Sequence, residues 1–345
     1  MRTVTFTGTD TVELVDKPVP DIGPTEVLLE VAGAGLCHSD LAIIGQPDSP
    51  LIGSTLGHEV AGTVAEVGTE VTDWSAGDTA IVALVLSCGR CRECLAGRDN
   101  QCRTVAPRSA PAPLSPGIGS PGGMAEYIAV QARHLDPLSG LDPVDSAPLS
   151  DAGLTPMHAI NSVRDRLTAD STALVLGLGG LGHMGLQILS ATTGVRIIAA
   201  DTDPEKVAYA SEHGADPAIP SDADTAARVL DETDGIGADA VFDFVGVQPT
   251  VDIARGCVAV GGALRFVGLG GGGFDYVAGS GSGLPWGVDV QRSYGGTRAD
   301  MGQVLALARA GRISVQTQRR DLGDAPRAFA DLDAGAVQGR IVLVP

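Results

Sequence analysis

The chain has 345 residues, of which 44% are hydrophobic, and this is more than one hydrophobic core usually holds, so two domains are expected. A formal net charge of −19 disfavours DNA, RNA and anionic membrane surfaces as partners, because each of these is itself a polyanion. A small-molecule partner fits this charge better. The N-terminal residues lack the apolar stretch of a secretion signal, so a cytoplasmic protein is expected.

The N-terminal part of the chain predicts an antiparallel β domain. Throughout residues 1–150, short segments rich in Val, Thr and Leu are separated by Gly, Pro and Asp, which is the pattern of strands joined by turns. The expected strands are residues 4–7, 12–14, 26–36, 60–68 and 78–85.

Beyond residue 170, strands alternate with helices, which predicts a doubly wound parallel sheet. Residues 173–195 lack Asp, Glu, Lys and Arg, but glycines interrupt them, which favours a strand, a turn and a buried helix over a membrane span. The glycine-rich residues 268–287 predict a loop, because no helix follows them. The expected strands are residues 172–177, 195–201, 238–244, 262–268, 288–296 and 339–345, and the expected helices are residues 181–194, 204–215 and 298–311.

Gly177, Gly179 and Gly182 form a G-x-G-x-x-G motif between an expected strand and an expected helix, with Gly180 in the same turn. Glycines there let the backbone approach a pyrophosphate, which the amide groups of the helix N-terminus bind. Asp201 ends the next strand, where a carboxylate binds the adenosine ribose hydroxyls and repels the 2′-phosphate of NADP. An ordinary tight turn with an incidental Asp is the alternative. In this context the motif predicts a Rossmann domain that binds NAD.

Four cysteines lie close together in the sequence: Cys88, Cys91, Cys94 and Cys102. Four thiolates with C-x-x-C spacing can surround a zinc ion in a tetrahedral shell with no open position, which indicates a structural site. A pair of disulfides is the alternative, and a reducing compartment disfavours it.

A second candidate metal site is more dispersed, since Cys37 and His58 are 21 positions apart. A thiolate and a neutral imidazole suit zinc, and an incomplete protein shell leaves a position for substrate. The spacing alone leaves another interpretation open, in which Cys37 is a small buried residue and His58 is a hydrogen-bonded core histidine.

The motifs AGLCHSD, LGHEVAGTV, PLSDAGLTPMHAI, VLGLGGLG and GRIVLVP, together with the four-cysteine segment, resemble the medium-chain zinc alcohol dehydrogenases along nearly the whole chain. The sequence looks closest to bacterial NAD-dependent secondary alcohol dehydrogenases of the actinobacterial type. The resemblance implies a GroES-like catalytic domain (residues 1–150 and 296–345, with the structural zinc lobe at 88–102), a Rossmann NAD-binding domain (residues 151–295), and two zinc ions per chain. It also implies a homo-oligomer, expected to be a tetramer that pairs sheet edges around residues 288–294.

By this resemblance, Cys37, His58 and Asp151 are the ligands of a catalytic zinc. Asp151 stands where many relatives have cysteine, and Asp is also a normal zinc ligand. Glu59 lies beside the metal as a possible alternate ligand, and Asp40 orients His58 through its other ring nitrogen.

The resemblance also implies how protons leave and where substrate binds. Ser39 takes the proton of the bound alcohol, but Ala42 replaces the histidine that ends the proton relay in many relatives. Two small residues in the implied pocket leave room for a secondary alcohol or ketone with one bulky arm. Residues 107–123 or a partner subunit filling this space is the alternative. The implied pocket residues are Ala42, Ile118, Tyr294 and Gly295.

Further cofactor contacts follow from the resemblance. Leu181 packs on the nicotinamide and Thr155 lines its site. Lys206 joins Asp201 at the adenosine ribose, and His38 and Arg340 neutralise the pyrophosphate. Main-chain groups near four further residues fix the carboxamide: Phe244, Val245, Val267 and Leu269.

Other interpretations of the motifs remain. A zinc-free quinone or enoyl reductase of the same superfamily would lack Cys37, His58 and Asp151 as a set, which this chain has. A non-catalytic zinc- and nucleotide-binding protein is an alternative from another class. A primary alcohol, polyol, formaldehyde or threonine dehydrogenase would share the same zinc motifs.

Overall fold

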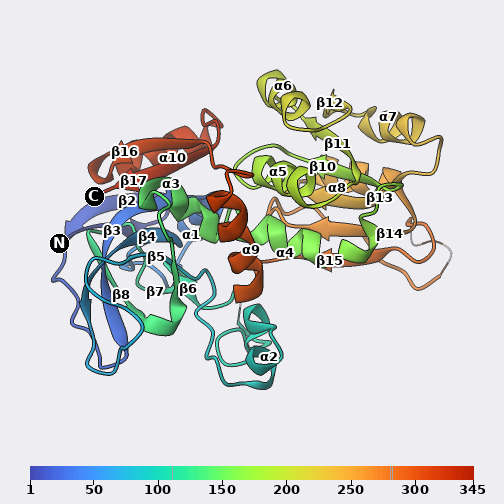
Figure 1. The fold of residues 1–345 in the computed structure, drawn as a ribbon. Coiled ribbons are helices and arrows are strands. Elements are labelled where there is room, and N and C mark those ends of the chain that lie inside the picture. The colour runs from blue at the N-terminus through green and yellow to red at the C-terminus, as the bar shows by residue number, and fades with distance from the viewer. Residues whose placement is uncertain (111, 280, 282) are drawn as a thin grey trace. The chain divides into compact units, whose positions relative to one another are not determined.

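The computed structural model describes residues 1–110, 112–279, 281 and 283–345 (Figure 1). The chain divides into two compact units, Met1–Leu154 with Gly295–Pro345 and Thr155–Tyr294. The boundaries therefore fall after residues 154 and 294, not after residues 150 and 295 as expected from the sequence. The first shift has a physical reason, because Asp151 packs against Cys37 and His58 of the first unit.

The first unit contains a seven-stranded sheet in the order β16-β17-β3-β4-β5-β9, with β8 also paired to β3. All pairs are antiparallel except β16 with β17, and a separate hairpin is formed by β1 and β2. The strands are β1 (Arg2–Gly8), β2 (Thr11–Asp16), β3 (Glu26–Leu36), β4 (Glu59–Val67), β5 (Thr79–Val82), β6 (Ser115–Pro116), β7 (Gly119–Ser120), β8 (Tyr127–Gln131), β9 (Leu135–Pro137), β16 (Thr317–Asp321) and β17 (Arg340–Val344).

The register of this sheet determines which residues meet at one of its ends. Gly35 lies opposite Glu59, and Leu36 lies opposite Ile341. Cys37, Glu59 and Arg340 are therefore neighbours although they are far apart in the sequence. The helices of this unit are α1 (His38–Ile44), α2 (Arg92–Leu95), α3 (Pro143–Ser146), α9 (Arg298–Arg309) and α10 (Ala325–Asp333), with 3-10 turns η1 (Asp99–Gln101), η2 (Ala132–His134), η3 (Ala147–Ser150) and η5 (Leu322–Asp324).

The second unit is built on six parallel strands in the order β12-β11-β10-β13-β14-β15. This order runs outward in both directions from its first strand, as in dinucleotide-binding Rossmann sheets, whose ligands bind at the carboxyl ends of the strands. The elements are α4 (Leu154–Asn161), η4 (Arg164–Arg166), β10 (Thr172–Leu176), α5 (Gly182–Thr192), β11 (Arg196–Asp201), α6 (Pro204–Glu212), β12 (Ala218–Pro220), α7 (Thr225–Glu232), β13 (Ala238–Asp243), α8 (Gln248–Cys257), β14 (Val258–Phe266) and β15 (Asp289–Arg292).

The predicted loop between β14 and β15 contains no helix in its described part. Gly270 donates its N–H to the carbonyl of Val245 and Gly272 to that of Gly246, so its first residues are bound to the turn after β13. Residues 280 and 282 of this loop, and residue 111 of the segment 107–123, lie outside the described residues. Among the helices of the described ranges, none is long and apolar enough to span a membrane.

Candidate metal centres and cofactor site

One end of the sheet of the first unit carries a buried group of possible metal ligands. Cys37 caps α1, His58 directly precedes β4, Glu59 opens that strand, and Asp151 follows η3. One ligand atom from each of these four residues lies within 4.8 Å of the others, and all four residues are less than 9% exposed. The structure thus brings together the residues that the sequence separates by up to 114 positions.

The distances within this group suit a metal ion. Oδ2 of Asp151 lies 3.5 Å from both the Cys37 thiol and Nε2 of His58. Oε2 of Glu59 is buried and has no hydrogen-bond partner, so this carboxylate has an oxygen available for a cation. Sulfur, imidazole and carboxylate donors together fit zinc.

The charges in this group also fit a bound cation. Burial raises the pKa of Glu59 to about 8, against the opposing effect of Arg340. Burial lowers the pKa of His58, but Asp40, Asp151 and Cys37 outweigh it and hold that pKa well above its ordinary value. Buried charges are normally paired or bound to a metal, and a divalent ion would replace the protons on these groups.

Asp40 supports the group from α1. Its Oδ2 accepts the N–H of Cys37 at 3.0 Å, and its Oδ1 lies 3.4 Å from Nδ1 of His58. A carboxylate on one ring nitrogen leaves the other nitrogen directed at the ligand group. The hydroxyl of Ser39 lies 3.6 Å from the Cys37 sulfur, so it is beside the candidate metal position.

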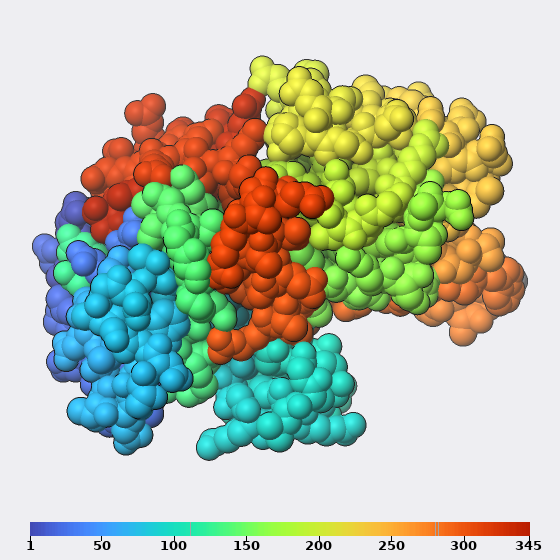
Figure 2. Space-filling view, in the orientation of Figure 1, coloured from blue at the N-terminus to red at the C-terminus, as the bar shows by residue number. Residues whose placement is uncertain are grey.

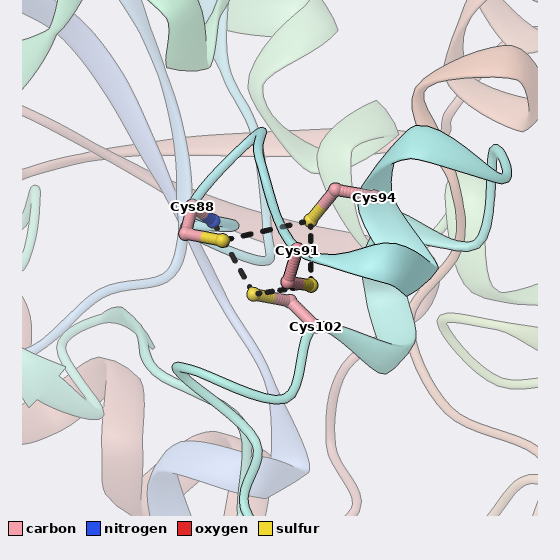
Figure 3. A group of neighbouring side chains, drawn as sticks. All are labelled: Cys88, Cys91, Cys94 and Cys102. Atoms are coloured by element: carbon pink, nitrogen blue, oxygen red, sulfur yellow. Dashed lines mark hydrogen bonds between the residues drawn. The ribbon is translucent and has the colours of Figure 1, made fainter.

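The four cysteines of residues 88–102 converge on one point (Figure 3). Their closest sulfur pairs are 3.5 Å (Cys91 and Cys94), 3.9 Å (Cys91 and Cys102) and 4.0 Å (Cys88 and Cys94) apart. A disulfide needs about 2.05 Å, whereas a tetrahedron with zinc–sulfur distances of about 2.3 Å has edges of roughly 3.8 Å. The thiols are free, which excludes the disulfide alternative and fits a closed zinc site.

The thiols of this cysteine lobe, defined as residues 88–102, differ in acidity. Hydrogen bonds from Thr104 and from the backbone lower the pKa of Cys88 to about 5, whereas burial raises the pKa of Cys94 to about 12. Cys88 is thus a thiolate at neutral pH, whereas Cys94 needs a bound cation to become one. Glu93 braces the lobe, with its oxygens 2.6 Å from Arg98 and 2.7 Å from Arg103. The sequence analysis did not identify this brace.

Replacing Cys94 with Ser is expected to remove one zinc ion per chain and to lower the melting temperature, because three thiolates no longer close the shell. Metal analysis and thermal unfolding check this. Cys257→Ser is the matched control, since that buried thiol only donates to the carbonyl of Ile253 and should keep the metal content unchanged. An unchanged zinc content in the Cys94 variant would show that the lobe binds no zinc.

The second unit contains the predicted phosphate-binding turn between β10 and α5. A Cβ atom on Gly182 would lie 1.7 Å from the carbonyl oxygen of Gly177, so no larger residue fits, while the space beside Gly179 is open. Oδ2 of Asp201 accepts the N–H of Leu178 at 2.6 Å. Asp201 therefore positions the turn as well as ending β11, which was not predicted.

The other predicted cofactor residues of this unit lie on several of its helices and turns. Thr155 is buried in α4, and Gly180 and Leu181 are half-buried in the phosphate-binding turn. Lys206 in α6 lies 3.9 Å from Asp203. Phe244, Val245, Val267 and Leu269 follow β13 and β14, and Leu269 is 58% exposed.

Asp243 was missed by the sequence analysis. It is buried at the end of β13, and its Oδ1 accepts the N–H groups of Val245 and Gly246 at 2.9 and 2.8 Å. Its Oδ2 accepts the hydroxyl of Thr250 at 2.8 Å. Asp243 thus determines the shape of the turn that carries two of the predicted carboxamide contacts.

Arg340 occupies a place that the sequence analysis did not foresee. It was assigned to the pyrophosphate with His38, which is exposed on α1. Arg340 is only 2% exposed, and its Nη2 lies 2.7 Å from Glu59 and 3.7 Å from Asp151. The guanidinium therefore compensates the carboxylates of the ligand group, and a direct phosphate contact stays a prediction.

The predicted pocket residues lie on separate segments. Ala42 is exposed on α1, Ile118 packs against the core beside β6 and β7, and Tyr294 is 39% exposed after β15. Gly295 has φ +50°, and a Cβ atom there would lie 3.3 Å from Val85. The left-handed backbone favours glycine at this position, and its role in leaving volume for the substrate stays a prediction.

The comparisons with known proteins agree with this geometry. Residues 23–140 match the family model of the alcohol dehydrogenase GroES-like domain, and residues 180–310 match that of the zinc-binding dehydrogenases. An NAD-dependent alcohol dehydrogenase from Sulfurisphaera tokodaii is 33% identical over 96% of either chain. A D-arabinose 1-dehydrogenase (NADP+) from Saccharolobus solfataricus is 32% identical over 96% of this chain and 93% of its own.

A solved structure is similar along its whole length. The acetophenone reductase of Geotrichum candidum, determined in complex with NAD, superposes with a TM-score of 0.87 and 30% identity, covering 100% of this chain and 97% of its own. Family models, relatives and structure agree in the GroES-like and Rossmann architecture. The chain therefore belongs to the medium-chain, zinc-type alcohol dehydrogenase family.

Proposed function

We propose that this chain is an NAD-linked oxidoreductase that interconverts secondary alcohols and ketones, with Cys37, His58 and Asp151 as the ligands of its catalytic zinc. The observation that carries the proposal is the buried group of sulfur, imidazole and carboxylate donors in which Glu59 keeps an unpartnered oxygen. Glu59 is the proposed alternate ligand. The cysteine lobe holds the second, structural zinc.

The residues around the ligand group position it and move a proton. When bound, zinc supplies a Lewis acid that lowers the pKa of an alcohol and polarises a carbonyl, and NAD supplies the hydride acceptor. Asp40 holds the backbone of Cys37 and faces His58, so both donors are fixed before any ligand arrives. Ser39, beside the Cys37 sulfur, would accept the proton of the bound alcohol and release its own hydroxyl proton to solvent, to which it is partly exposed. Beyond Ser39, Ala42 offers no proton acceptor.

The cofactor proposal follows from the second unit. The turn of Gly177, Gly179 and Gly182 would receive the pyrophosphate at the N-terminus of α5. Asp201 would bind the adenosine ribose, with Lys206 nearby, and its carboxylate favours NAD over NADP. Leu181, Thr155 and the main chain after β13 and β14 would hold the nicotinamide.

The substrate proposal is a secondary alcohol or ketone with one bulky arm. The similar reductase from Geotrichum candidum is named for acetophenone, a ketone of this type. A sugar or polyol is the second candidate, since a relative of comparable identity is a D-arabinose 1-dehydrogenase. The closer relationship to actinobacterial secondary alcohol dehydrogenases stays a prediction.

A substrate panel tests the proposal. We expect NADH to form with 1-phenylethanol and propan-2-ol, and to form more slowly with ethanol and D-arabinose. Each alcohol is assayed with NAD and, in parallel, with NADP. Ala42→Trp serves as the pocket probe, because Ala42 lies in a regular helix whereas any substitution of Gly295 strains its backbone. Selective loss of 1-phenylethanol turnover is expected. Equal loss with propan-2-ol would exclude the bulky-arm assignment, and faster turnover of D-arabinose would favour the sugar.

We further propose a cytoplasmic homotetramer. β15 (Asp289–Arg292) is the edge strand of its sheet, and Val290 on it is 37% exposed. An unpaired edge can pair with the same edge of a second copy across a two-fold axis. Light scattering is expected to give four chains per particle, and a monomer at every concentration would contradict the proposal.

A further inference from the structure

The cysteine lobe contacts residues 295–298, the segment with which the chain re-enters the first unit. Asp99, in η1 of the lobe, accepts the backbone N–H of Arg298 with both carboxylate oxygens, each 3.3 Å away. In Figure 2, α9 lies directly against the lobe. This contact joins residues 199 positions apart.

The side chain of Arg298 fixes the same segment from a second direction. Its guanidinium lies 2.7 Å from Oδ1 of Asp136 and donates to the carbonyl of Leu135 at 3.1 Å. It also donates to the carbonyl of Arg133. The start of α9 is therefore held between β9 and the lobe.

Gly295 is held by the chain that leads into the lobe. The nearest neighbours of a Cβ atom there would be Val85 at 3.3 Å and Leu84 at 3.7 Å, three and four residues before Cys88. Its backbone lies in the left-handed region, so a residue with a side chain would be strained there. Residues 295–298 thus lie against the segment that leads into Cys88, the first cysteine of the lobe. They also bond to the carboxylate of Asp99, three residues before Cys102, the last cysteine.

The chain's other crossing between its units lies at the same place. Leu154, the last residue of the first unit before the chain leaves it, lines one narrow void together with Asp99, Gly296 and Arg298. Both crossing segments therefore border the lobe within the first unit.

We propose that the cysteine lobe anchors both points at which the chain passes between its units, with Asp99 as the positioning residue for residues 295–298. A closed zinc shell has no open position for chemistry, but it makes the loop that carries Asp99 rigid. The consequence for catalysis rests on the proposed function, because Gly295 and the adjoining Tyr294 are proposed pocket residues. The anchoring itself does not depend on it.

Hydrogen exchange tests the anchoring without any substrate. In the zinc-loaded enzyme, Asp99→Ala is expected to speed amide exchange in peptides covering 295–301 about tenfold, which corresponds to about 1.4 kcal/mol. Asp99→Asn keeps an acceptor oxygen, so it should restore most of the protection. Arg92→Gln is the matched control, since Arg92 is an exposed residue of α2 in the same lobe and its substitution should leave this exchange unchanged.

Kinetics provide the second readout. Asp99→Ala is expected to raise KM for the alcohol more than it lowers kcat, with two zinc ions retained and NAD binding, measured by fluorescence, unchanged. Unchanged exchange at 295–301 in Asp99→Ala, or the same acceleration in Arg92→Gln, overturns the proposal. If Asp99→Ala does not fold, Asp99→Asn is expected to exchange somewhat faster than wild type at 295–301, because it keeps one of the two acceptor oxygens, and exchange no faster than in wild type would overturn the proposal equally. A wild-type enzyme inactive on every alcohol would refute the proposed function and leave the exchange result valid.

Discussion

Replacing His58 with Ala is expected to lower kcat/KM for alcohol oxidation about a thousandfold or more, which corresponds to roughly 4 kcal/mol of transition-state stabilisation. His58 is 2% exposed and supplies the one imidazole of the buried ligand group. Without it, Cys37 and Asp151 form an incomplete metal site. Steady-state kinetics and metal analysis check this, with circular dichroism to confirm that the fold is kept.

His134→Ala is the matched control for this experiment. His134 is similarly buried in the same unit, but its Nε2 bonds to the carbonyl of Ser87 at 2.8 Å and lies outside the ligand group. Its loss should affect stability and leave kcat/KM within about threefold. A His58→Ala enzyme that keeps two zinc ions and a substantial fraction of its activity would show that the ligand assignment is wrong.

The native enzyme is expected to prefer NAD to NADP by at least about tenfold in kcat/KM, or about 1.4 kcal/mol, because Asp201 repels a 2′-phosphate. Asp201→Asn removes the charge and keeps an acceptor for the N–H of Leu178, so it should narrow the preference mainly by improving NADP. Initial rates with both cofactors measure the ratio. A native kcat/KM with NADP that is comparable to that with NAD would overturn this explanation.

Asp201→Gly separates the two roles of this carboxylate. Asp201 accepts the N–H of Leu178 with one oxygen and that of Asp203 with the other, at 2.6 and 2.9 Å. The glycine variant loses both contacts. For each of the two cofactors, NAD and NADP, its affinity should therefore be lower than that of the Asp201→Asn variant. Equal behaviour of the two variants would show that only the charge matters.

The elements that the sequence predicts well are those whose side chains carry the pattern. β3 is long and apolar, and the turn before α5 has a spaced glycine motif, so both were expected. β16 was missed, because its sequence TQRRD has no apolar residue and it is held by backbone pairing with β17. The helix α10 was also missed, although its buried residues recur at the i, i+3, i+4, i+7 spacing of an amphipathic helix: Ala325, Ala328, Phe329 and Leu332.

The same distinction applies to the sites. The four cysteines of the lobe lie within 15 positions, so their spacing alone predicts a metal site. Cys37 and Asp151 are 114 positions apart, and only the resemblance joined them before the structure did. The pairing of Glu59 with Arg340 was missed, because it depends on the order of β17, β3 and β4 in one sheet.

The contact between Glu59 and Arg340 also orders events during synthesis. These residues are 281 positions apart, so at about 5–20 residues per second a ribosome reaches Arg340 roughly 15–60 s after Glu59. The second unit, which is continuous in sequence, is complete before Arg340 exists. During that interval Glu59 and Asp151 lack the guanidinium that compensates them in the finished protein. The proposed catalytic centre is therefore completed only after the whole second unit has been synthesised.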